Sequence, residues 1–341
     1  MAGMNIKEVA ARAKVSTATV SRTINGSPLV VPETAQRVWR VIRQLGYYPN
    51  TQARALVRGR SRTFGLIISD IVNPFFPELV KGFEDTAIRY GYEVLLSNTG
   101  YDSGRMTHGA RRMIERQVDG VAIMTSEFGR PLIDELSKRE LPIVFLDVGK
   151  VSTHISNLAV DYAKGIREAV QHLLSLGHRR IAFISGPLTL KSARVRQDAF
   201  LECMHQAGIA ENARYLVESN HKIDGGEGAM RRLLDLPEPP TAVLTSNDLT
   251  AFGTMRAIFA AGLRVPADVS VVGFDDIAFS EFTEPPLTTV RLSRDELGRM
   301  AFQALFDMVE AEHSGGKKIP VDTSLIVRQS TAQVRNGKTS G

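Results

Sequence analysis

One predicted helix near the N-terminus exposes side chains of the kinds that read DNA. Its outer face carries small groups and, one turn later, a long cation, in the order Thr17, Ala18, Ser21 and Arg22. A helix that presents such a face fits the major groove, where its N-terminal residues reach the edges of bases. Arg22 has the geometry to donate two hydrogen bonds to a guanine, whereas Ala18 offers only apolar contact, for example to a thymine methyl group. The segment therefore predicts sequence-specific DNA contact.

A second set of polar residues follows directly after apolar, strand-like segments. Asp147 comes after PIVFL, Asn247 after TAVLTS and Asp275 after VVGF. Parallel sheets bind ligands at the carboxyl ends of their strands, so we expect these side chains to converge on one cleft. Arg194 and Arg196, at the start of a predicted helix, are expected to join them. Carboxylates, an amide and a guanidinium suit a ligand with several hydroxyls, because each buried hydroxyl needs a hydrogen-bond partner.

Asn247 and Asp248 are adjacent, and only one of them is assigned to the cleft. An Asn or Asp after a strand often caps the helix that follows. We therefore interpret Asp248 as the cap of that helix and assign ligand contact to Asn247.

The face that reads DNA requires two helices around a tight turn, and residues 6–26 fit this arrangement. Ser16 is the N-cap candidate of the second helix. The spacing of the apolar residues predicts a shared core of Val9, Ala10, Ala13, Val20 and Ile24. A third helix is predicted over residues 32–45, with Pro32 at its first position and Gly46 after its last.

Charge is distributed unevenly along the chain. The first 62 residues contain eleven Lys or Arg and two Asp or Glu, although the whole chain has a net charge of only +5. A basic segment joined to a mildly acidic remainder is typical of a nucleic-acid-binding module attached to a domain that need not touch phosphate. Because the basic excess coincides with the helix-turn-helix pattern, it favours DNA binding over an ordinary solvated surface.

Residues 50–62, NTQARALVRGRSR, form a basic connector. The segment has helical propensity at residues 51–57 but too few apolar residues to fold alone. A short helix that forms only against DNA is the interpretation we favour, and a flexible tether is the alternative.

From residue 64 onward, strand-like and helical segments alternate. Strands are predicted at 64–69, 92–98, 120–125, 142–147, 179–186, 241–247 and 269–276, and helices between them include 76–90, 164–176, 195–207, 226–234 and 249–261. This alternation predicts parallel, doubly wound sheets covered by helices on both faces. About seven such strands suit two similar lobes better than one sheet.

Length and composition agree with a soluble protein of several domains. The chain has 341 residues, 43% of them hydrophobic, and exceeds the roughly 100–200 residues of one domain. The single Cys203 excludes an intramolecular disulfide and suits a reducing cytosol. No apolar run approaches the roughly 18 residues of a membrane span, and no secretory signal is visible. We expect a cytoplasmic protein that is associated with the nucleoid when bound to DNA.

Seven segments together resemble the signatures of the lactose/galactose repressor family of bacterial transcription regulators. They are KEVA (7–10), VSTATVSRTIN (15–25), GYYPN (46–50), LGHRRIAFISGP (176–187), SNDLTAFG (246–253), GLRVPADVSVVGFDD (262–276) and PPLTTVRL (285–292). Each alone is weak, but seven in register over nearly the whole chain are highly specific. The resemblance implies an α/β fold: an all-α helix-turn-helix head and a two-lobed, doubly wound domain like the periplasmic binding proteins, with three crossovers between the lobes.

The resemblance also implies a homodimer whose two heads bind a pseudo-palindromic operator. The positions that read bases in the family match Thr17, Ala18 and Arg22. The positions that contact phosphate match Ser16, Thr19, Ser21 and Asn25. Leu56 falls on a hinge-helix leucine that wedges into the minor groove, with Ala53 and Arg54 beside it. Such a wedge is physically sensible, because the few kcal/mol lost in unstacking bases are recovered through contacts with bent DNA.

In the body of the protein, the resemblance implies an effector pocket. The family's pocket positions match Arg196, Asn247 and Asp275, and Phe75 and Phe76 match an aromatic wall that stacks on an effector ring. One of these two rings has the alternative of packing into the core. Additional pocket neighbours are Ser69, Asp70, Asp147, Arg194 and His221. The implied effector is a sugar or sugar derivative, and we predict no cofactor and no metal.

Four segments follow from this organisation. They are a helix-turn-helix domain at 1–49, a hinge at 50–62, a two-lobed effector-binding and dimerisation domain at 63–330, and a polar tail at 331–341. Tetramers of this family need a C-terminal heptad helix, and the tail lacks heptads, so we expect a dimer without membrane attachment.

Two other functions are weighed against a ligand-responsive repressor. A solute-binding protein of a transporter would share the lobes but should carry a signal peptide in place of the basic head. An enzyme on this scaffold is disfavoured, because the sequence shows no Ser/His/Asp arrangement, no metal-spaced His/Cys cluster and no GxxxxGK phosphate loop. We therefore predict a regulator and not an enzyme.

Overall fold

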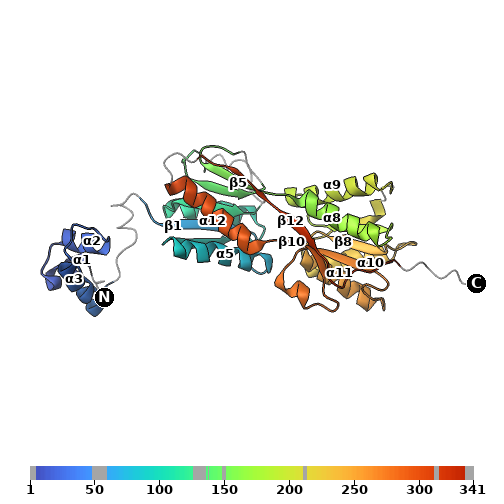
Figure 1. The fold of residues 1–341 in the computed structure, drawn as a ribbon, viewed down its shortest axis with the longest axis horizontal. Helices are drawn as coiled ribbons and strands as arrows, with labels where there is room; N and C mark the ends of the chain where they lie inside the picture. Colours follow the sequence, from blue (N-terminus) through green and yellow to red (C-terminus); the bar gives the residue numbers. More distant parts are fainter. Residues whose placement is uncertain are drawn as a thin grey trace, which may run out of the picture. The chain divides into compact units, whose positions relative to one another are not determined.

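The computed structural model describes residues 5–47, 60–125, 136, 138–147, 151–209, 213–310 and 315–334. The chain divides into two compact units, Met1–Arg62 and Thr63–Gly341 (Figure 1). The predicted DNA contacts Ala53, Arg54 and Leu56 lie outside the described residues.

The described part of the N-terminal unit contains three helices, α1 (Ile6–Ala13), α2 (Thr17–Ile24) and α3 (Pro32–Leu45). Asn5 caps α1 and Ser16 caps α2, each by accepting backbone hydrogen bonds with its side-chain oxygen. As predicted, α3 begins with Pro32 and ends at Gly46, which has a left-handed backbone. The core contains all the predicted residues, with Ile24 at its edge: Val9, Ala10, Ala13, Val20, Val38, Val41, Ile42 and Leu45.

Within its described residues, the larger unit has two six-stranded sheets, each at the centre of one lobe. Lobe 1 has the strand order β11 (Lys318–Val321), β5 (Ile155–Val160), β4 (Ile143–Leu146), β3 (Gly120–Met124), β1 (Thr63–Ile68) and β2 (Glu93–Asn98). Lobe 2 has the order β12 (Thr323–Ile326), β10 (Thr288–Leu292), β9 (Ser270–Asp275), β8 (Ala242–Thr245), β6 (Ile181–Ser185) and β7 (Leu216–Glu218). Neighbouring strands are parallel except β10 and β12. The predicted pair of parallel sheets is confirmed.

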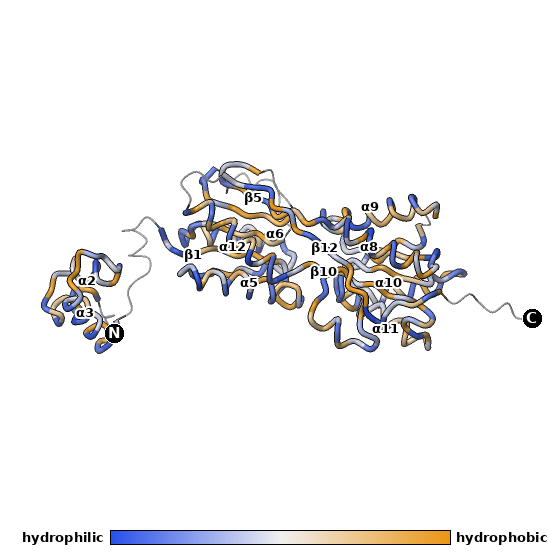
Figure 2. Tube along the Cα trace, in the orientation of Figure 1, coloured by the Kyte–Doolittle hydropathy of each residue, from blue (hydrophilic) through white to orange (hydrophobic). Residues whose placement is uncertain are grey.

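Helices cover both faces of each sheet. In lobe 1, one face packs against α5 (Phe75–Arg89) and α12 (Arg294–Glu310), and the other against α6 (Ser103–Glu115). In lobe 2, α8 (Tyr162–Ser175) and α9 (Lys191–Gln206) lie opposite α10 (Ile223–Leu234) and α11 (Asp248–Ala260). Both faces of a strand are therefore apolar, and hydrophobic residues run through the strands of both sheets (Figure 2).

The chain passes between the lobes three times. It leaves lobe 1 after β5 to form α8, returns after β10 to form α12, and leaves again between β11 and β12. This topology confirms the three predicted crossovers. It also places the carboxyl ends of the parallel strands of both sheets on either side of one interlobe space.

All seven predicted strands are present, as β1, β2, β3, β4, β6, β8 and β9. The sequence did not predict β5, β7, β10, β11 or β12. Their apolar patterns are weak: Arg291 interrupts β10, and Lys318 and Pro320 interrupt β11, which lies at a sheet edge where proline is tolerated. None of the described helices has both the length and the apolar character needed to cross a membrane.

Glycines allow one pair of helices to pack closely in each lobe. A Cβ atom on Gly82 of α5 would lie 2.3 Å from the carbonyl oxygen of Asp295 in α12. In lobe 2, a Cβ atom on Gly253 of α11 would lie 1.9 Å from the carbonyl oxygen of Ile223 in α10. Because the clash is with backbone, the helices must separate to accept a side chain.

Gly253→Ala should therefore lower the free energy of unfolding by about 1–3 kcal/mol through overpacking. Gly228→Ala on α10 is the matched control, because nothing lies within 4 Å of its added Cβ and alanine favours a helix. Urea unfolding of both variants tests this. Equal stability of the two variants would contradict the close glycine contact.

Candidate functional site

The exposed face of α2 carries the side chains that were predicted to read bases. Thr17, Ala18 and Arg22 are exposed, whereas Val20 and Thr23 on the opposite face are buried. One face of α2 therefore packs against the core of the head. The opposite face, which carries Arg22, is accessible to the groove of a DNA duplex.

The residues predicted to contact phosphate lie near the two ends of α2. The hydroxyl of Ser16 lies 2.9 Å from that of Thr19 and accepts a hydrogen bond from the Thr19 N–H at 3.1 Å. At the other end, the Asn25 amide donates to the Ser21 hydroxyl at 3.5 Å. These contacts orient short polar groups at both ends of the helix.

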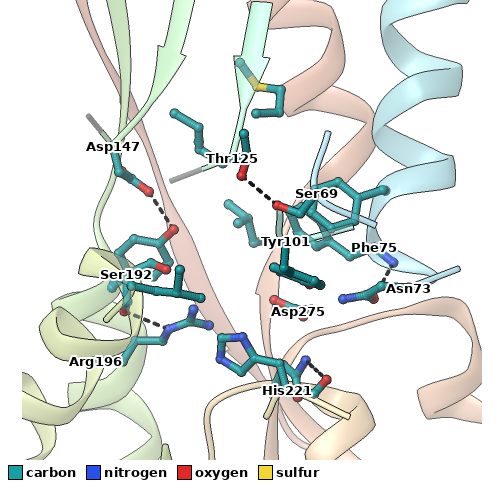
Figure 3. Close-up of a pocket in the computed structure, with 17 residues that line it drawn as sticks. Ser69, Asn73, Phe75, Tyr101, Thr125, Asp147, Ser192, Arg196, His221 and Asp275 are labelled. Carbon is teal, nitrogen blue, oxygen red and sulfur yellow. Dashed lines mark hydrogen bonds between the residues drawn. The ribbon is translucent and has the colours of Figure 1, made fainter. Parts of the chain in front are cut away.

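A cavity lies between the two lobes of the larger unit (Figure 3). Its volume is about 100 Å³, and residues of both lobes line it. Eight of the ten residues predicted for the pocket line it: Ser69, Phe75, Phe76, Asp147, Arg196, His221, Asn247 and Asp275.

The other two predicted pocket residues, Asp70 and Arg194, do not line the cavity. Asp70 accepts a hydrogen bond from the Val72 N–H at 3.1 Å and so closes a local turn. Arg194 is exposed and donates to the carbonyl of Thr189 at 3.0 Å. Residues two positions apart on a helix point in different directions, so only one of Arg194 and Arg196 faces the cavity.

Arg196 is a buried cation in the cavity wall. Its guanidinium carbon lies 4.9 Å from the ring centroids of both Tyr162 and Phe274. Nη1 donates to the carbonyl of Ser246 at 2.5 Å, and Nε donates to that of Ser192 at 3.0 Å. In the described part of the chain, no carboxylate forms an ion pair with it. The aromatic rings and the main-chain carbonyls therefore fix the orientation of the Arg196 guanidinium. Its positive charge can pair with an acceptor group of a ligand in the cavity.

Asp147 is satisfied by the protein itself. Its carboxylate accepts hydrogen bonds from the Tyr162 hydroxyl at 2.6 Å and from the Val160 N–H at 2.7 Å. Burial raises the pKa of Asp147, and these two hydrogen bonds oppose the rise. Its carbonyl accepts from Lys191 Nζ at 2.9 Å. Asp147 thus ties lobe 1 to the first residues of lobe 2.

Asp275 has a carboxylate that accepts no hydrogen bond from any described residue. It ends β9 with φ +109°, and the side chain is 8% exposed. Burial first and the charge of Asp248 second raise the pKa of Asp275 to about 8, against the opposing charges of Arg196 and Arg294. This carboxyl is free to pair with a ligand hydroxyl as either donor or acceptor.

His221 has a buried ring nitrogen, Nε2, without a hydrogen-bond partner among the described residues. The ring lies against Gly186, where a Cβ would be 1.7 Å from Nε2. Burial and the charge of Arg196 lower the pKa of His221 to about 3, so the imidazole is neutral near pH 7. A neutral ring with a free nitrogen can form one hydrogen bond with a ligand.

Asn247, and not Asp248 as predicted, caps the helix that follows β8. Asn247 caps α11, because its Oδ1 accepts from the Thr250 N–H at 2.9 Å, and its amide donates to the carbonyl of His221 at 3.0 Å. It still lines the cavity, but both ends of its amide are already engaged with the protein.

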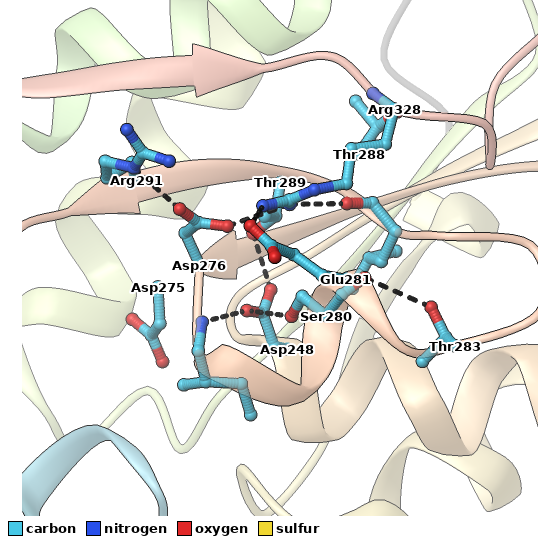
Figure 4. A network of polar contacts seen from close by, with 12 residues as sticks. Asp248, Asp275, Asp276, Ser280, Glu281, Thr283, Thr288, Thr289, Arg291 and Arg328 are labelled. Atoms are coloured by element: carbon cyan, nitrogen blue, oxygen red, sulfur yellow. Dashed lines mark hydrogen bonds and ion pairs between the residues drawn. The ribbon is translucent and has the colours of Figure 1, made fainter.

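Asp248 is fully buried within a network of polar contacts (Figure 4). It does not line the cavity. Burial raises its pKa to about 7, although three hydrogen bonds oppose the rise. The donors are Thr289 Oγ1 at 2.5 Å, Ser280 Oγ at 2.7 Å and the Ile277 N–H at 2.8 Å. The predicted helix cap is wrong: Asp248 instead joins η2 (Ala278–Glu281) and β10 to the start of α11.

Lobe 1 contributes an aromatic wall and a hydroxyl pair. Phe75 and Phe76 begin α5, and their ring centroids lie 5.2 Å apart in an edge-to-face contact. Both rings line the cavity and both pack into the core. The predicted aromatic wall and the alternative of core packing therefore apply to the same two residues. Ser69 donates to the Thr125 hydroxyl at 2.9 Å at the end of β3.

Sequence reasoning missed nine residues that line the cavity: Asn73, Tyr101, Met124, Thr125, Leu146, Tyr162, Leu190, Ser192 and Leu292. Tyr162 follows β5 and Leu292 ends β10, two strands that the sequence did not predict. Thr125 is the last residue of the predicted strand 120–125 and directly follows β3, so the strand-end rule that found Asp147 was sufficient to find it. The described residues contain no group of three His, Cys, Asp or Glu placed to hold a metal.

The buried carboxyls predict a dependence of stability on pH. The pKa of Asp275 is about 8 in the folded protein and roughly 3.9 when unfolded, so the folded state holds the proton more tightly. Stability from this group is full below pH 4 and is lost as pH rises to 8.

We expect Asp275→Asn to flatten the decline of unfolding free energy between pH 5 and pH 8, by up to about 1.4 kcal/mol per pH unit. Denaturant unfolding at several pH values is the measurement, with the exposed Asp235→Asn as control. Parallel curves for wild type and Asp275→Asn would show that this carboxyl is ionised throughout.

Comparison with known proteins agrees with the arrangement of the head and the cavity. Residues 5–50 match the family described as "Bacterial regulatory proteins, lacI family", and residues 170–331 match the periplasmic binding protein-like domain. The HTH-type transcriptional repressor CytR of Escherichia coli K12 is 34% identical over 96% of both chains. Catabolite control protein A of Priestia megaterium is 33% identical over 96% of this chain and 99% of the relative.

Solved structures of bacterial transcription regulators are also similar to this chain. The Lac repressor dimer bound to operator and the anti-inducer ONPF has a TM-score of 0.84 at 28% identity, over 97% of this chain and 99% of that one. A complex of the transcriptional regulator CelR with cellobiose has a TM-score of 0.72 at 31% identity, over 96% of this chain and 99% of that one. The chain therefore belongs to the lacI family of bacterial regulatory proteins, and it is a transcriptional regulator, not an enzyme.

Proposed function

We propose that this protein represses transcription as a homodimer on a pseudo-palindromic operator, and that a sugar or sugar derivative in the cavity controls its affinity for that operator. The observation that carries the proposal is the combination, in one chain, of an exposed α2 face and an interlobe cavity with polar groups that lack partners. Similarity to the Lac repressor dimer on operator supports the DNA half. Similarity to the CelR–cellobiose complex supports the effector half.

The chemistry of the cavity favours a neutral ligand rich in hydroxyls. Arg196 donates hydrogen bonds, and His221 adds a neutral nitrogen. The carboxyl of Asp275 can donate or accept, because its raised pKa of about 8 leaves it mostly protonated near pH 7. A hydroxyl both donates and accepts, so a few hydroxyls on one ring can satisfy all three groups. The Phe75–Phe76 wall gives such a ring an apolar surface.

The same proposal assigns the segments of the chain. Residues 1–49 contact the major groove, 50–62 form the hinge, 63–330 bind effector and dimerise, and 331–341 are a polar tail. The boundary between the compact units after Arg62 supports the junction. Part of the tail packs on lobe 2, because the Val334 N–H donates to the carbonyl of Leu176 at 2.9 Å. The protein would act in the cytoplasm, at the nucleoid.

Exposed aromatic residues support self-association. Phe279 is 59% exposed and Phe282 is 82% exposed, at and directly after η2. Large apolar side chains gathered at one surface usually mark protein contacts. We assign this surface of lobe 2 to the dimer.

Arg22→Ala should weaken operator binding and relax base preference at one position in each half-site, by roughly 1–3 kcal/mol. Selection from a randomised operator library, followed by anisotropy titrations, measures both effects. Arg43→Ala, at the end of α3, is the comparison, because its loss should not change base preference. A uniform loss of affinity for all sequences in Arg22→Ala would make Arg22 a phosphate contact.

Arg196→Met should reduce effector affinity at least tenfold, because the ligand loses a charged donor worth roughly 1.5–3 kcal/mol, while operator binding persists. Arg194→Met is the matched control two residues away and outside the cavity lining. Calorimetry with cellobiose, ribose and adenine as probes measures the affinities. Binding of adenine with no response to either sugar would reject the sugar assignment and leave the regulator.

A further inference from the structure

Arg294 occupies a special place in the topology. It is the first residue of α12, directly after the second crossing between the lobes. Its side chain is only 10% exposed, and its Nε and Nη2 lie 2.9 Å and 2.8 Å from the same carboxylate oxygen of Glu78. Neither Arg294 nor Glu78 lines the ligand cavity.

The two partners of Arg294 belong to different lobes. Glu78 lies in the first turn of α5, which also carries Phe75 and Phe76 in the lobe 1 wall of the cavity. Nη1 of Arg294 donates to the main-chain carbonyl of Asp275, in the lobe 2 wall. One nearly buried guanidinium therefore joins both walls from outside the cavity.

The contact with Asp275 bears on the conformation of that residue. At φ +109°, its backbone is in a region that side chains with a Cβ rarely adopt, so surrounding contacts must hold it there. The hydrogen bond from Arg294 is one such contact. It fixes the peptide group next to the carboxyl that faces the cavity.

We propose that Arg294 is a positioning residue that couples the arrangement of the two lobes in this structure to the ligand-binding geometry of Asp275. Rotation of one lobe about the crossovers changes the separation between Glu78 and the Asp275 carbonyl, and a single guanidinium cannot span both once they move apart. The bridge therefore stabilises only arrangements in which both partners are within reach of Arg294, and its loss shifts the population towards forms in which the lobes lie further apart.

The part of this proposal that concerns ligand affinity rests on the proposed function, whereas the part that concerns lobe closure does not. The first test accordingly uses no ligand. Spin labels at His108→Cys on α6 and Asp198→Cys on α9, both exposed, report the distance between the lobes in a Cys203→Ala background. Labelled full-length protein is mixed with excess unlabelled protein, so that most assemblies hold one labelled chain.

Double electron–electron resonance should show that Arg294→Gln and Glu78→Gln each enlarge the fraction at longer distance about threefold or more. The double variant should be no more open than either single variant, because the two side chains act as one unit. Arg299→Gln is the matched control on α12, since its partners Asp295 and Glu296 lie on the same helix. Distributions identical to wild type in both single variants would overturn the proposal.

The second test measures ligand affinity by calorimetry with cellobiose and ribose. Arg294→Gln should weaken binding of the sugar that wild type accepts by at least threefold, and Arg294→Lys should restore less than half of the loss, because lysine cannot reach both partners. Unchanged affinity with opened lobes would overturn the coupling. If wild type binds neither sugar, the proposed effector class fails, and the distance measurement still decides the role of Arg294 in closure.

Discussion

Three passages of the chain between two parallel sheets constrain the rest of the larger unit. Because the crossovers follow β5, β10 and β11, neither lobe is a contiguous segment, and each is completed by elements from the far end of the sequence. Parallel strands place their carboxyl ends together, so the same crossings bring Asp147 of lobe 1 opposite Asp275 of lobe 2. A cavity between lobes of this kind changes shape whenever the lobes rotate. Ligand binding and domain motion are thus coupled by the topology itself.

The polar groups in the cavity differ in how completely the protein satisfies their hydrogen bonds. Asp147 and Asn247 have their hydrogen bonds met by Tyr162, Val160, Thr250 and His221, and they act as structural ties. Asp275 and His221 are buried without that compensation, and Arg196 is buried without a carboxylate partner among the described residues. Burying such groups costs stability, which the raised pKa of Asp275 and the lowered pKa of His221 both express. A ligand that supplies the missing partners regains part of that cost, so these three groups favour occupancy of the cavity.

Local sequence rules predicted the elements that have strong local signals. The helices of the head follow from caps and apolar spacing, and the strand-end rule found Asp147, Asn247 and Asp275. The rules failed where distant contacts decide the outcome. Asp248 follows a strand like a cap residue, but Ile277, Ser280 and Thr289, brought close only by the folded sheet, make it a buried acceptor. Tyr162 was missed because the strand before it mixes polar and apolar residues, and Arg194 was included because direction around a helix was not considered.

The central claim is that one ligand-binding event in the cavity and one DNA-binding event at the head are energetically linked. The most direct measurement is a closed cycle on the full-length protein: the operator affinity with and without saturating sugar, and the sugar affinity with and without saturating operator. Linkage requires the two ratios to be equal, and we expect each to differ from unity by about 5- to 150-fold. Ratios of one, with a sugar bound tightly in the cavity, would contradict the account, because the two sites would then be independent.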